Sequence, residues 1–253
     1  MLPRWAALSN PSHYVSGARG VDGEVFRDGR HGLHRGRVAR QLVAAGHDVV
    51  AIARNPESAR DLESIGVDVR RGDITDPDSL RGLMAGVDGV FHIAGWYKIG
   101  SKDPSEGERL NVAGTRNVLT AMKELRVPKG VYTSTLAVFS DTHGRLVDET
   151  YRHNGRWLTE YDWTKWIAYY EIAEPMIRAG LPLVIVQPGV NYGPGDTSEI
   201  RPTFVRYLQG KLRAIPKRTA YCWAHVEDTA RASSRWNEGG PARRTSSRLR
   251  PTR

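Results

Sequence analysis

The sequence predicts an α/β protein whose core is a doubly wound parallel sheet, because short apolar runs alternate with an amphipathic segment. Residues 87–95 (V-D-G-V-F-H-I-A-G), 129–135 (K-G-V-Y-T-S-T) and 181–186 (L-P-L-V-I-V) have the length and composition of buried strands. Residues 106–123 lie between the first two runs and repeat apolar side chains with the period of a helix. This order favours parallel strands that helices cover on both faces.

The segment that should open such a sheet is not apolar. Before Arg27 the chain has no apolar periodicity, and from there to Arg37 it reads R-D-G-R-H-G-L-H-R-G-R. Gly29 and Gly32 keep the spacing of a phosphate-binding G-x-x-G-x-x-G loop, but Arg35 stands at the third glycine position. A polar, arginine-rich segment cannot supply the central strand of a parallel sheet.

Tyr161 and Lys165 stand four residues apart in Y-D-W-T-K, so a helix places both side chains on one face. An ammonium beside a phenol favours the phenolate, which predicts a Tyr161 pKa below its usual value of about 10. Such a pair suits carbonyl–alcohol chemistry. Alone it would more simply be two polar residues on a solvated helix face. The hydroxyl residues Thr133, Ser134 and Thr135 end the strand upstream, where open α/β sheets bind ligands, and they favour the catalytic interpretation.

These features belong to a series of short motifs that occur in a fixed order: R-Q-L-V-A-A-G-H from Arg40, G-D-I-T-D from Gly72, F-H-I-A-G from Phe91, N-V-A-G-T-R-N-V from Asn111, Y-T-S-T from Tyr132, Y-x-x-x-K from Tyr161, Q-P-G-V-N-Y-G-P-G-D from Gln187 and H-V-E-D from His225. With them the chain resembles the extended short-chain dehydrogenase/reductase family, in particular its NAD(P)-dependent epimerase/dehydratase and dihydroflavonol-reductase-like branch. The resemblance extends over residues 38–232 and implies a Rossmann-like, NAD(P)-binding fold.

The resemblance implies catalytic roles for four residues. Tyr161 would be the general acid/base, and Lys165 would lower its pKa and hold the nicotinamide ribose. Thr135 would hold the substrate oxygen, with Ser134 as the alternative, or it would only cap the strand end. Asn111 would brace the active-site strand, or it would be a satisfied amide of the core.

The resemblance also implies cofactor contacts. Asp73 and Ile74 match the pair that meets the adenine, although Asp73 also suits a turn. Ala94 and Gly95 match the segment under the cofactor, and Pro188 begins the loop over the nicotinamide.

Three residues follow the strand that ends at Gly95. We expect Trp96, Tyr97 and Lys98 to face the substrate, and aromatic packing is the alternative for the first two.

Charge at Arg54 favours NADP over NAD, with NAD as the alternative. In NAD-preferring relatives the second strand ends in an acidic residue that binds the ribose 2′-hydroxyl. Here V-V-A-I-A ends at Ala53, and Arg54 follows. A guanidinium can make charge-assisted bidentate bonds to a 2′-phosphate. The plainer alternative is a solvated loop charge.

A frame error would explain the missing first strand. Permitted codons for residues 27–38, read one base later, spell V-T-G-A-T-G-F-I-G-G-A, which is the family's strand and glycine loop. Residues 235–251 have a permitted encoding that reads M-E-R-G-R-P-G-E-T-Y-I-I-A-A-E-A in a shifted frame, which resembles the family's helix and strand after H-V-E-D. Two matches at the right positions lead us to the hypothesis that both ends are misread.

Charge distribution agrees with this hypothesis. The chain has 37 basic and 28 acidic residues and a net charge of +9. Residues 1–37 hold six arginines and three acids, and residues 231–253 hold seven arginines and one acid, so residues 38–230 are neutral. A basic chain ordinarily suggests nucleic-acid or anionic-membrane binding. Here the excess lies only in the misread segments, so we expect neither partner.

Other features set the class of protein. Cys222 is the only cysteine, which excludes an internal disulfide and is typical of the reducing cytoplasm. No stretch of eighteen apolar residues occurs, and the histidines lack paired metal-ligand spacing, so we expect a cytoplasmic protein without a metal. A homodimer is one option for its assembly.

Four regions and one main function follow. Residues 1–37 are an aberrant segment, 38–186 an NAD(P)-binding domain, 187–232 a truncated substrate-binding region, and 233–253 a basic, disordered tail. We expect NADP-dependent reduction of a carbonyl, or oxidation of an alcohol, of a small molecule. A nucleotide-sugar epimerase or dehydratase would use the same residues. An inactive or sensor-type cofactor-binding protein is an alternative of another class, favoured by Arg35 and opposed by the intact Tyr161 and Lys165.

Overall fold

The computed structural model describes the chain over residues 33–97, 105–196, 198, 200–214, 220–234 and 245–246. Gly29, Gly32 and Lys98 lie outside the described residues, as does most of the segment 1–37.

The strands of the described chain pair in parallel. They are β1 (Val50–Ala53), β2 (Asp68–Arg71), β3 (Val90–His92), β4 (Gly130–Thr133), β5 (Leu183–Gln187), β6 (Val190–Tyr192), β7 (Trp223–His225) and β8 (Thr245–Ser246). β3, β4, β5 and β8 form one sheet in that order, while β1 pairs with β2 and β6 with β7.

Helices connect these strands. The α-helices are α1 (Leu33–Ala44), α2 (Arg60–Glu63), α3 (Pro77–Met84), α4 (Ser105–Gly107), α5 (Thr115–Glu124), α6 (Glu160–Trp166), α7 (Glu174–Arg178), α8 (Ile200–Leu208) and α9 (Val226–Ser234). Short 3₁₀ turns form η2 (Pro56–Ala59) and η4 (Leu136–Phe139), and wider π-helical turns form η3 (Glu108–Gly114) and η5 (Ile167–Ala173).

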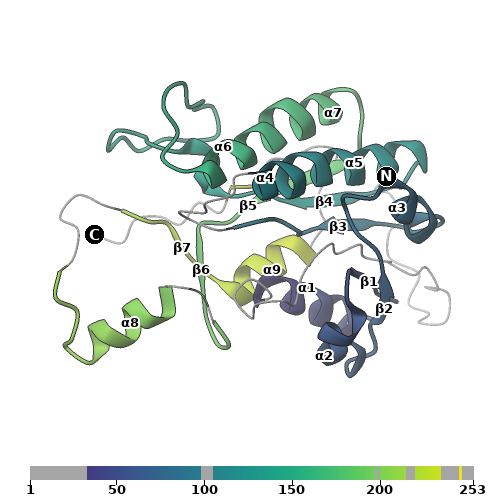
Figure 1. Cartoon of the computed structure of the whole chain (residues 1–253), viewed down its shortest axis with the longest axis horizontal. Coiled ribbons are helices and arrows are strands. Elements are labelled where there is room, and N and C mark those ends of the chain that lie inside the picture. The colour runs from purple at the N-terminus through teal and green to yellow at the C-terminus, as the bar shows by residue number, and fades with distance from the viewer. Residues whose placement is uncertain are drawn as a thin grey trace, which may run out of the picture.

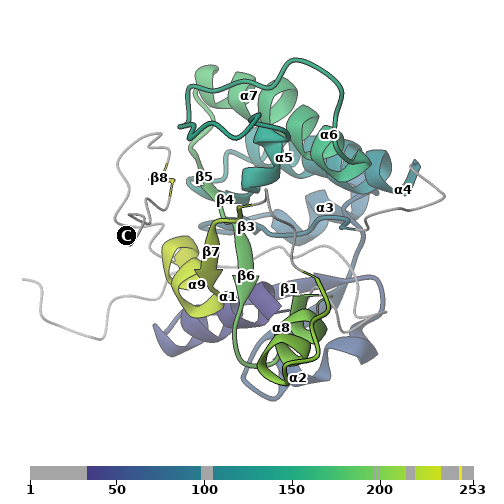
Figure 2. The same ribbon diagram turned by 90° about the vertical axis from the view of Figure 1, so that its left-hand side faces the viewer.

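Helices cover the four-stranded sheet on both faces (Figure 1). α5, α6 and α7 lie over one face, and α1 and α9 pack against each other on the opposite side. Figure 1 also shows β6, β7 and α8 to one side of α1 and α9, and Figure 2 shows the same layers from that end of the molecule. The layering confirms the predicted doubly wound α/β fold.

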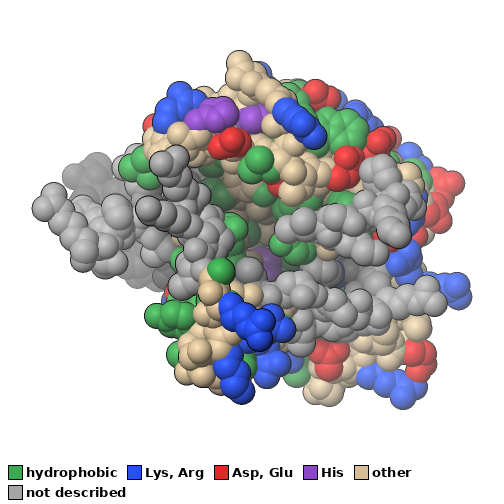
Figure 3. All heavy atoms as spheres, turned by 60° about the vertical axis from the view of Figure 1, so that its left-hand side comes forward, with side chains coloured by type: hydrophobic (Ala, Val, Ile, Leu, Met, Phe, Trp, Pro, Cys, Tyr) green, Lys and Arg blue, Asp and Glu red, His purple; other side chains and the backbone are tan. Residues whose placement is uncertain are grey.

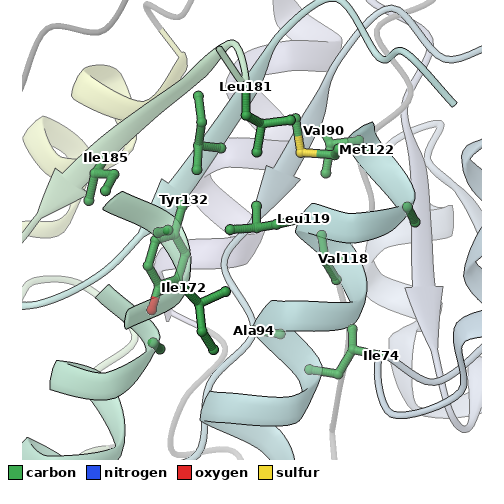
Figure 4. Close-up of a cluster of buried hydrophobic side chains, with 14 of the residues drawn as sticks. Ile74, Val90, Ala94, Val118, Leu119, Met122, Tyr132, Ile172, Leu181 and Ile185 are labelled. Atoms are coloured by element: carbon green, nitrogen blue, oxygen red, sulfur yellow. The ribbon is translucent and has the colours of Figure 1, made fainter. Parts of the chain in front are cut away.

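The strands β3 and β4 each contribute to two hydrophobic clusters, because successive side chains point to opposite faces. Val90 and Tyr132 belong to the cluster under α5 and η5, and Figure 4 shows Tyr132 extending from β4 toward Ile172. Their neighbours Phe91 and Val131 belong to the cluster on the α1 side. Both faces are therefore apolar, as a parallel sheet between two helical layers requires.

The sheet is interrupted between β1 and β3. Within the described residues β1 pairs only with β2, and β3 is the outermost strand of its sheet. All residues of β1 and β3 are nevertheless buried, unlike those of an ordinary exposed edge. One strand inserted here would join the two sheets, and the chain before α1 is where the sequence analysis expects that strand.

His34 supports the frame-error hypothesis from the described part of the N-terminal segment. It lies in α1 and is 7% exposed. Burial, together with Arg35, lowers the pKa of His34 to about 4, and its Nδ1 has no hydrogen-bond partner. The shifted reading places isoleucine at this position, which would suit the apolar environment without leaving an unpaired polar atom.

The C-terminal segment differs from the disordered tail that the sequence analysis expects from residue 233 onward. α9 continues to Ser234, and Ser233 Oγ lies 3.3 Å from His34 Nε2. Thr245 and Ser246 form β8 beside Val186 and Gln187 of β5. The shifted reading has two consecutive isoleucines in this part of the chain, and isoleucine favours strands.

Restoring the first strand should restore cofactor binding. We expect the chain as given to be poorly soluble or partly unfolded and to bind NADPH weakly. Each buried, unpaired backbone group costs about 1–3 kcal/mol, and a domain holds only about 5–15 kcal/mol in reserve. Replacing residues 27–37 with V-T-G-A-T-G-F-I-G-G-A should give tight NADPH binding in calorimetric titration.

The control for this experiment is the same replacement in scrambled order, which should not bind. Tight NADPH binding by the unmodified chain would contradict the frame-error hypothesis.

Candidate active site

Asn111 joins the end of β3 to the helix that carries Tyr161 and Lys165. It lies in η3 and is 1% exposed. Its Oδ1 accepts a hydrogen bond from the Trp96 backbone N–H at 2.7 Å, and its Nδ2 donates to the Trp96 carbonyl at 3.0 Å. The same Nδ2 donates to Thr164 Oγ1 at 2.9 Å. The amide is thus a satisfied core group whose partners lie next to Lys165.

Thr164 is a site residue that the sequence analysis missed. It is fully buried, and its hydroxyl donates to the Tyr161 carbonyl oxygen at 3.1 Å while it accepts from Asn111. A threonine three residues after Tyr161 in Y-D-W-T-K can bond back to that carbonyl, which was the available signal. Thr164 therefore links the first turn of α6 to η3.

Helix α6 presents Tyr161 and Lys165 beside the carboxyl end of β4. The Thr159 side chain caps the helix by accepting from the Asp162 backbone N–H at 3.1 Å. Lys165 is 3% exposed, and its Nζ donates to the Thr133 carbonyl at 3.1 Å. Tyr161 is partly exposed, so a ligand can reach it, whereas Lys165 is buried.

The predicted direction of the Tyr161 pKa was wrong. Burial raises the pKa of Tyr161, and the opposing effects of the Lys165 charge and of a hydrogen bond with Thr135 do not reverse it. Burial also lowers the pKa of Lys165, and Tyr161 offsets this in part. Residue spacing identifies the neighbouring charge but not the desolvation, which here has the larger effect.

The hydroxyl residues at the end of β4 have different environments. Thr135 is partly buried, and its Oγ1 accepts from the Ala137 N–H at 3.2 Å, which caps η4. Ser134 is buried, and its Oγ has no hydrogen-bond partner in the described chain. Thr133 Oγ1 and, at the end of β5, Gln187 Nε2 are buried without a hydrogen-bond partner in the described chain. Unpaired polar atoms at this edge favour a polar ligand there.

Arg54 and Asp73 come from adjacent strand ends, because the Gly72 N–H donates to the Ala53 carbonyl at 3.1 Å. Burial lowers the pKa of Arg54, and the nearby Asp73 charge opposes this effect. Asp73 Oδ1 accepts from both the N–H and the hydroxyl of Thr75 at 2.8 Å, so its carboxylate has the turn role that the sequence also allowed.

Ile74, the other expected adenine neighbour, is a core residue. It is 1% exposed, and its carbonyl accepts from Asn117 Nδ2 at 3.0 Å. Its side chain packs against Gly114, where a Cβ atom would lie 2.5 Å from Ile74 Cδ1.

Gly95 lies at the centre of the site. A Cβ atom there would stand 3.3 Å from Asn111 Oδ1 and 3.6 Å from Lys165 Nζ. Because glycine has no side chain, the space beside these two groups stays open. Ala94 before it is 1% exposed. The Pro188 carbonyl accepts from the Leu136 N–H at 3.0 Å, which ties the loop after β5 to η4.

The aromatic residues after Gly95 differ from each other. Trp96 is 6% exposed and belongs to the core, so the expectation that it faces a substrate was wrong. Its Nε1 donates to Glu106 Oε2 at 3.1 Å. Tyr97 is 39% exposed and meets the Tyr161 ring edge-on, with centroids 4.8 Å apart. Tyr97 therefore borders the candidate catalytic phenol.

Two hollows lie outside this cluster. One of about 620 Å³ is formed by α8 and the chain after β6, with Tyr192, Phe204 and Leu208 in its wall. Figure 3 brings the α8 side of the molecule forward and shows hydrophobic side chains scattered among charged ones. The other hollow, of about 360 Å³, is lined by Arg109 and Arg116 and their neighbours on η3 and α5.

The described residues contain no group of three His, Cys, Asp or Glu side chains arranged to hold a metal ion. Among the described helices none is both long and apolar enough to cross a membrane.

The parallel sheet, its two helical layers and the polar cluster at its carboxyl edge define a Rossmann-like protein of the dinucleotide-binding class. The sequence profile of the NAD dependent epimerase/dehydratase family matches residues 29–240. The chain belongs to this family, as its motifs predicted.

Known relatives agree with this assignment. The chain is 35% identical over 188 residues to a 2-alkyl-3-oxoalkanoate reductase of Stenotrophomonas maltophilia, covering 70% of this chain and 54% of that protein. It is 31% identical over 213 residues to cinnamoyl-CoA reductase 1 of Oryza sativa, covering 77% and 62%. The crystal structure of gox2253 superposes with a TM-score of 0.72 at 27% identity, covering 88% of this chain and 67% of that one. The chain thus spans little more than half the length of the two reductases.

Removing the Asn111 amide should destabilise the fold. Asn111→Ala leaves the Trp96 N–H and carbonyl and the Thr164 hydroxyl without their buried partner, and each unpaired group costs about 1–3 kcal/mol. We expect the urea midpoint to fall clearly with an unchanged slope.

Asn117→Ala is the matched control, because Asn117 is partly exposed and its Nδ2 donates to the Ile74 carbonyl. An equal fall of the urea midpoint for the two variants would mean that the Asn111 bonds stabilise the fold no more than the Asn117 bond does.

Proposed function

We propose that this protein is an NAD(P)-dependent oxidoreductase that reduces a carbonyl, or oxidises an alcohol, of a small molecule. The observation that carries the proposal is the partly exposed Tyr161 phenol beside buried Lys165 and the Thr135 hydroxyl. These three groups lie at the carboxyl edge of the sheet, where ligands of this fold bind. The identity to two reductases supports a carbonyl substrate.

The residues present fit a nicotinamide dinucleotide. Gly95 offers a flat surface beside Lys165, and the unpartnered Thr133 and Gln187 side chains offer polar contacts at the same sheet edge. When bound, the cofactor supplies or accepts the hydride. In this proposal Lys165 holds the nicotinamide ribose, Ala94 and Gly95 lie under the cofactor, and Pro188 begins the loop that covers it.

Tyr161 would transfer the proton that accompanies the hydride. Because burial raises its pKa, the phenol carries its proton at neutral pH and can donate it to a carbonyl oxygen. Lys165 and Thr135 oppose that shift, so they stabilise the phenolate that remains after donation. Thr135 would also hold the substrate oxygen, and Asn111 would brace the strand end through its bonds to Trp96.

NADP is the cofactor that the charge at Arg54 supports, with NAD as the alternative. Asp73 and Ile74 would border the adenine. The proposed partner is a small molecule, the proposed location is the cytoplasm, and a homodimer is one proposed assembly. The division into residues 38–186, for the cofactor, and 187–232, for part of the substrate site, belongs to the same proposal.

Tyr161→Phe should reduce turnover by about two or more orders of magnitude, because the change removes the general acid. NADPH affinity should stay nearly the same. The assay follows NADPH absorbance in the version with the restored first strand, with a panel of carbonyl compounds.

Tyr151→Phe serves as the control, since the Tyr151 hydroxyl donates to the Asp141 carbonyl at 3.0 Å and Tyr151 is not among the groups that act on Tyr161. A Tyr161→Phe enzyme that keeps its activity would remove Tyr161 from its proposed role.

Arg54→Ala should weaken NADPH binding by about 1.5–3 kcal/mol, the value of a hydrogen bond to a charged group. NADH binding should hardly change, because NADH lacks the 2′-phosphate. Calorimetric titration with both cofactors measures the difference. An equal loss for the two would mean that Arg54 is structural.

A further inference from the structure

A second guanidinium reaches the turn beside Arg54. Arg109 lies on η3, far from this turn in sequence, and its Nη1 donates to Thr75 Oγ1 at 3.4 Å. Thr75 in turn donates to Asp73 at 2.8 Å through both its N–H and its hydroxyl. Arg54 borders the same turn from the end of β1, since the strand ends at Ala53 and Gly72 are hydrogen-bonded. Two cations from separate elements therefore flank residues 73–75.

The two guanidiniums act on each other. Burial is the main cause of the lowered pKa of Arg54, and the positive charge of Arg109 adds to it. The carboxylates of Asp73 and Glu106 oppose the shift, and Asp73 also accepts two hydrogen bonds from Thr75. Like charges held at close range are unfavourable unless an anion bridges them, and a guanidinium presents five donors for that purpose.

We propose that Arg109 is the second cation of a 2′-phosphate site, which it forms together with Arg54 across the turn of residues 73–75. A phosphate monoester is dianionic near neutral pH and has three acceptor oxygens, so it can bridge two guanidiniums at once. A ribose 2′-hydroxyl carries no charge and can satisfy neither. Arg109 thus selects NADPH over NADH, a role for which the sequence pattern gave no signal.

This inference rests on the proposed function, because it assumes that the adenosine half of a cofactor binds at β1 and β2. Its test needs no turnover. The probes are adenosine 2′,5′-bisphosphate and 5′-AMP, which differ only in the 2′-phosphate, titrated by calorimetry against the full chain and against the version with the restored first strand. Arg109→Ala should weaken the bisphosphate by about tenfold or more and leave 5′-AMP within about twofold.

Arg116→Ala is the matched control. Arg116 lies on the same stretch of helix, lines the same hollow as Arg109 and is exposed. It is not among the groups that act on Arg54. Its removal lowers the net charge equally, so it should leave both nucleotides nearly unaffected. A loss as large as that of Arg109→Ala would overturn the proposal, because it would show a general effect of charge.

The double variant Arg54→Ala, Arg109→Ala tests whether the two residues share one phosphate. A shared ligand predicts a combined loss of affinity clearly smaller than the product of the two single losses. Independent losses, or equal losses for the bisphosphate and 5′-AMP, would overturn the proposal while leaving the oxidoreductase function intact. If neither nucleotide binds either version of the chain, the cofactor site itself fails, and the role of Arg109 with it.

Discussion

The buried amide of Asn111 is the interaction on which the candidate site depends. It binds the backbone after β3 on one side and Thr164 of α6 on the other, so it fixes two elements that are far apart in sequence. Thr164 passes this constraint to the carbonyl of Tyr161, and Lys165 is anchored separately to the carbonyl of Thr133. A catalytic pair placed only by helix geometry could rotate with α6. Here Thr164 ties the helix to Asn111, and Lys165 ties it to β4, so the orientation of the pair is fixed before a ligand binds.

Burying a parallel sheet on both faces leaves a readable pattern, and for this reason much of the fold could be predicted. Val90 and Phe91 are both apolar because they enter opposite clusters, and the same holds for Val131 and Tyr132. The hydroxyl residues after β4 were predicted for a related reason, since the carboxyl ends of parallel strands meet at one edge. Both inferences rest on local sequence and a single geometric rule.

What the sequence could not predict depends on desolvation and on long-range contacts. The spacing of Tyr161 and Lys165 revealed that the Lys165 charge acts on the phenol. It did not reveal that burial has the larger effect and raises the Tyr161 pKa. Trp96 follows the strand β3, yet α4 and η3 cover it through Glu106 and Asn111. Arg109 approaches Thr75 only because the chain folds back, so no motif marks it. In each case the deciding contact joins residues that no local pattern connects.

The break between β1 and β3 is best understood together with the charge distribution. A neutral central region that folds with two apolar sheet faces is flanked by arginine-rich ends, and within the described residues the sheet is interrupted between β1 and β3. His34 lies buried in α1 where the shifted reading has isoleucine. A polar segment selected for solubility would have no reason to place an ionisable side chain in the core. A misread apolar sequence would do so, because the rest of the fold still offers the environment for which the original residue was suited.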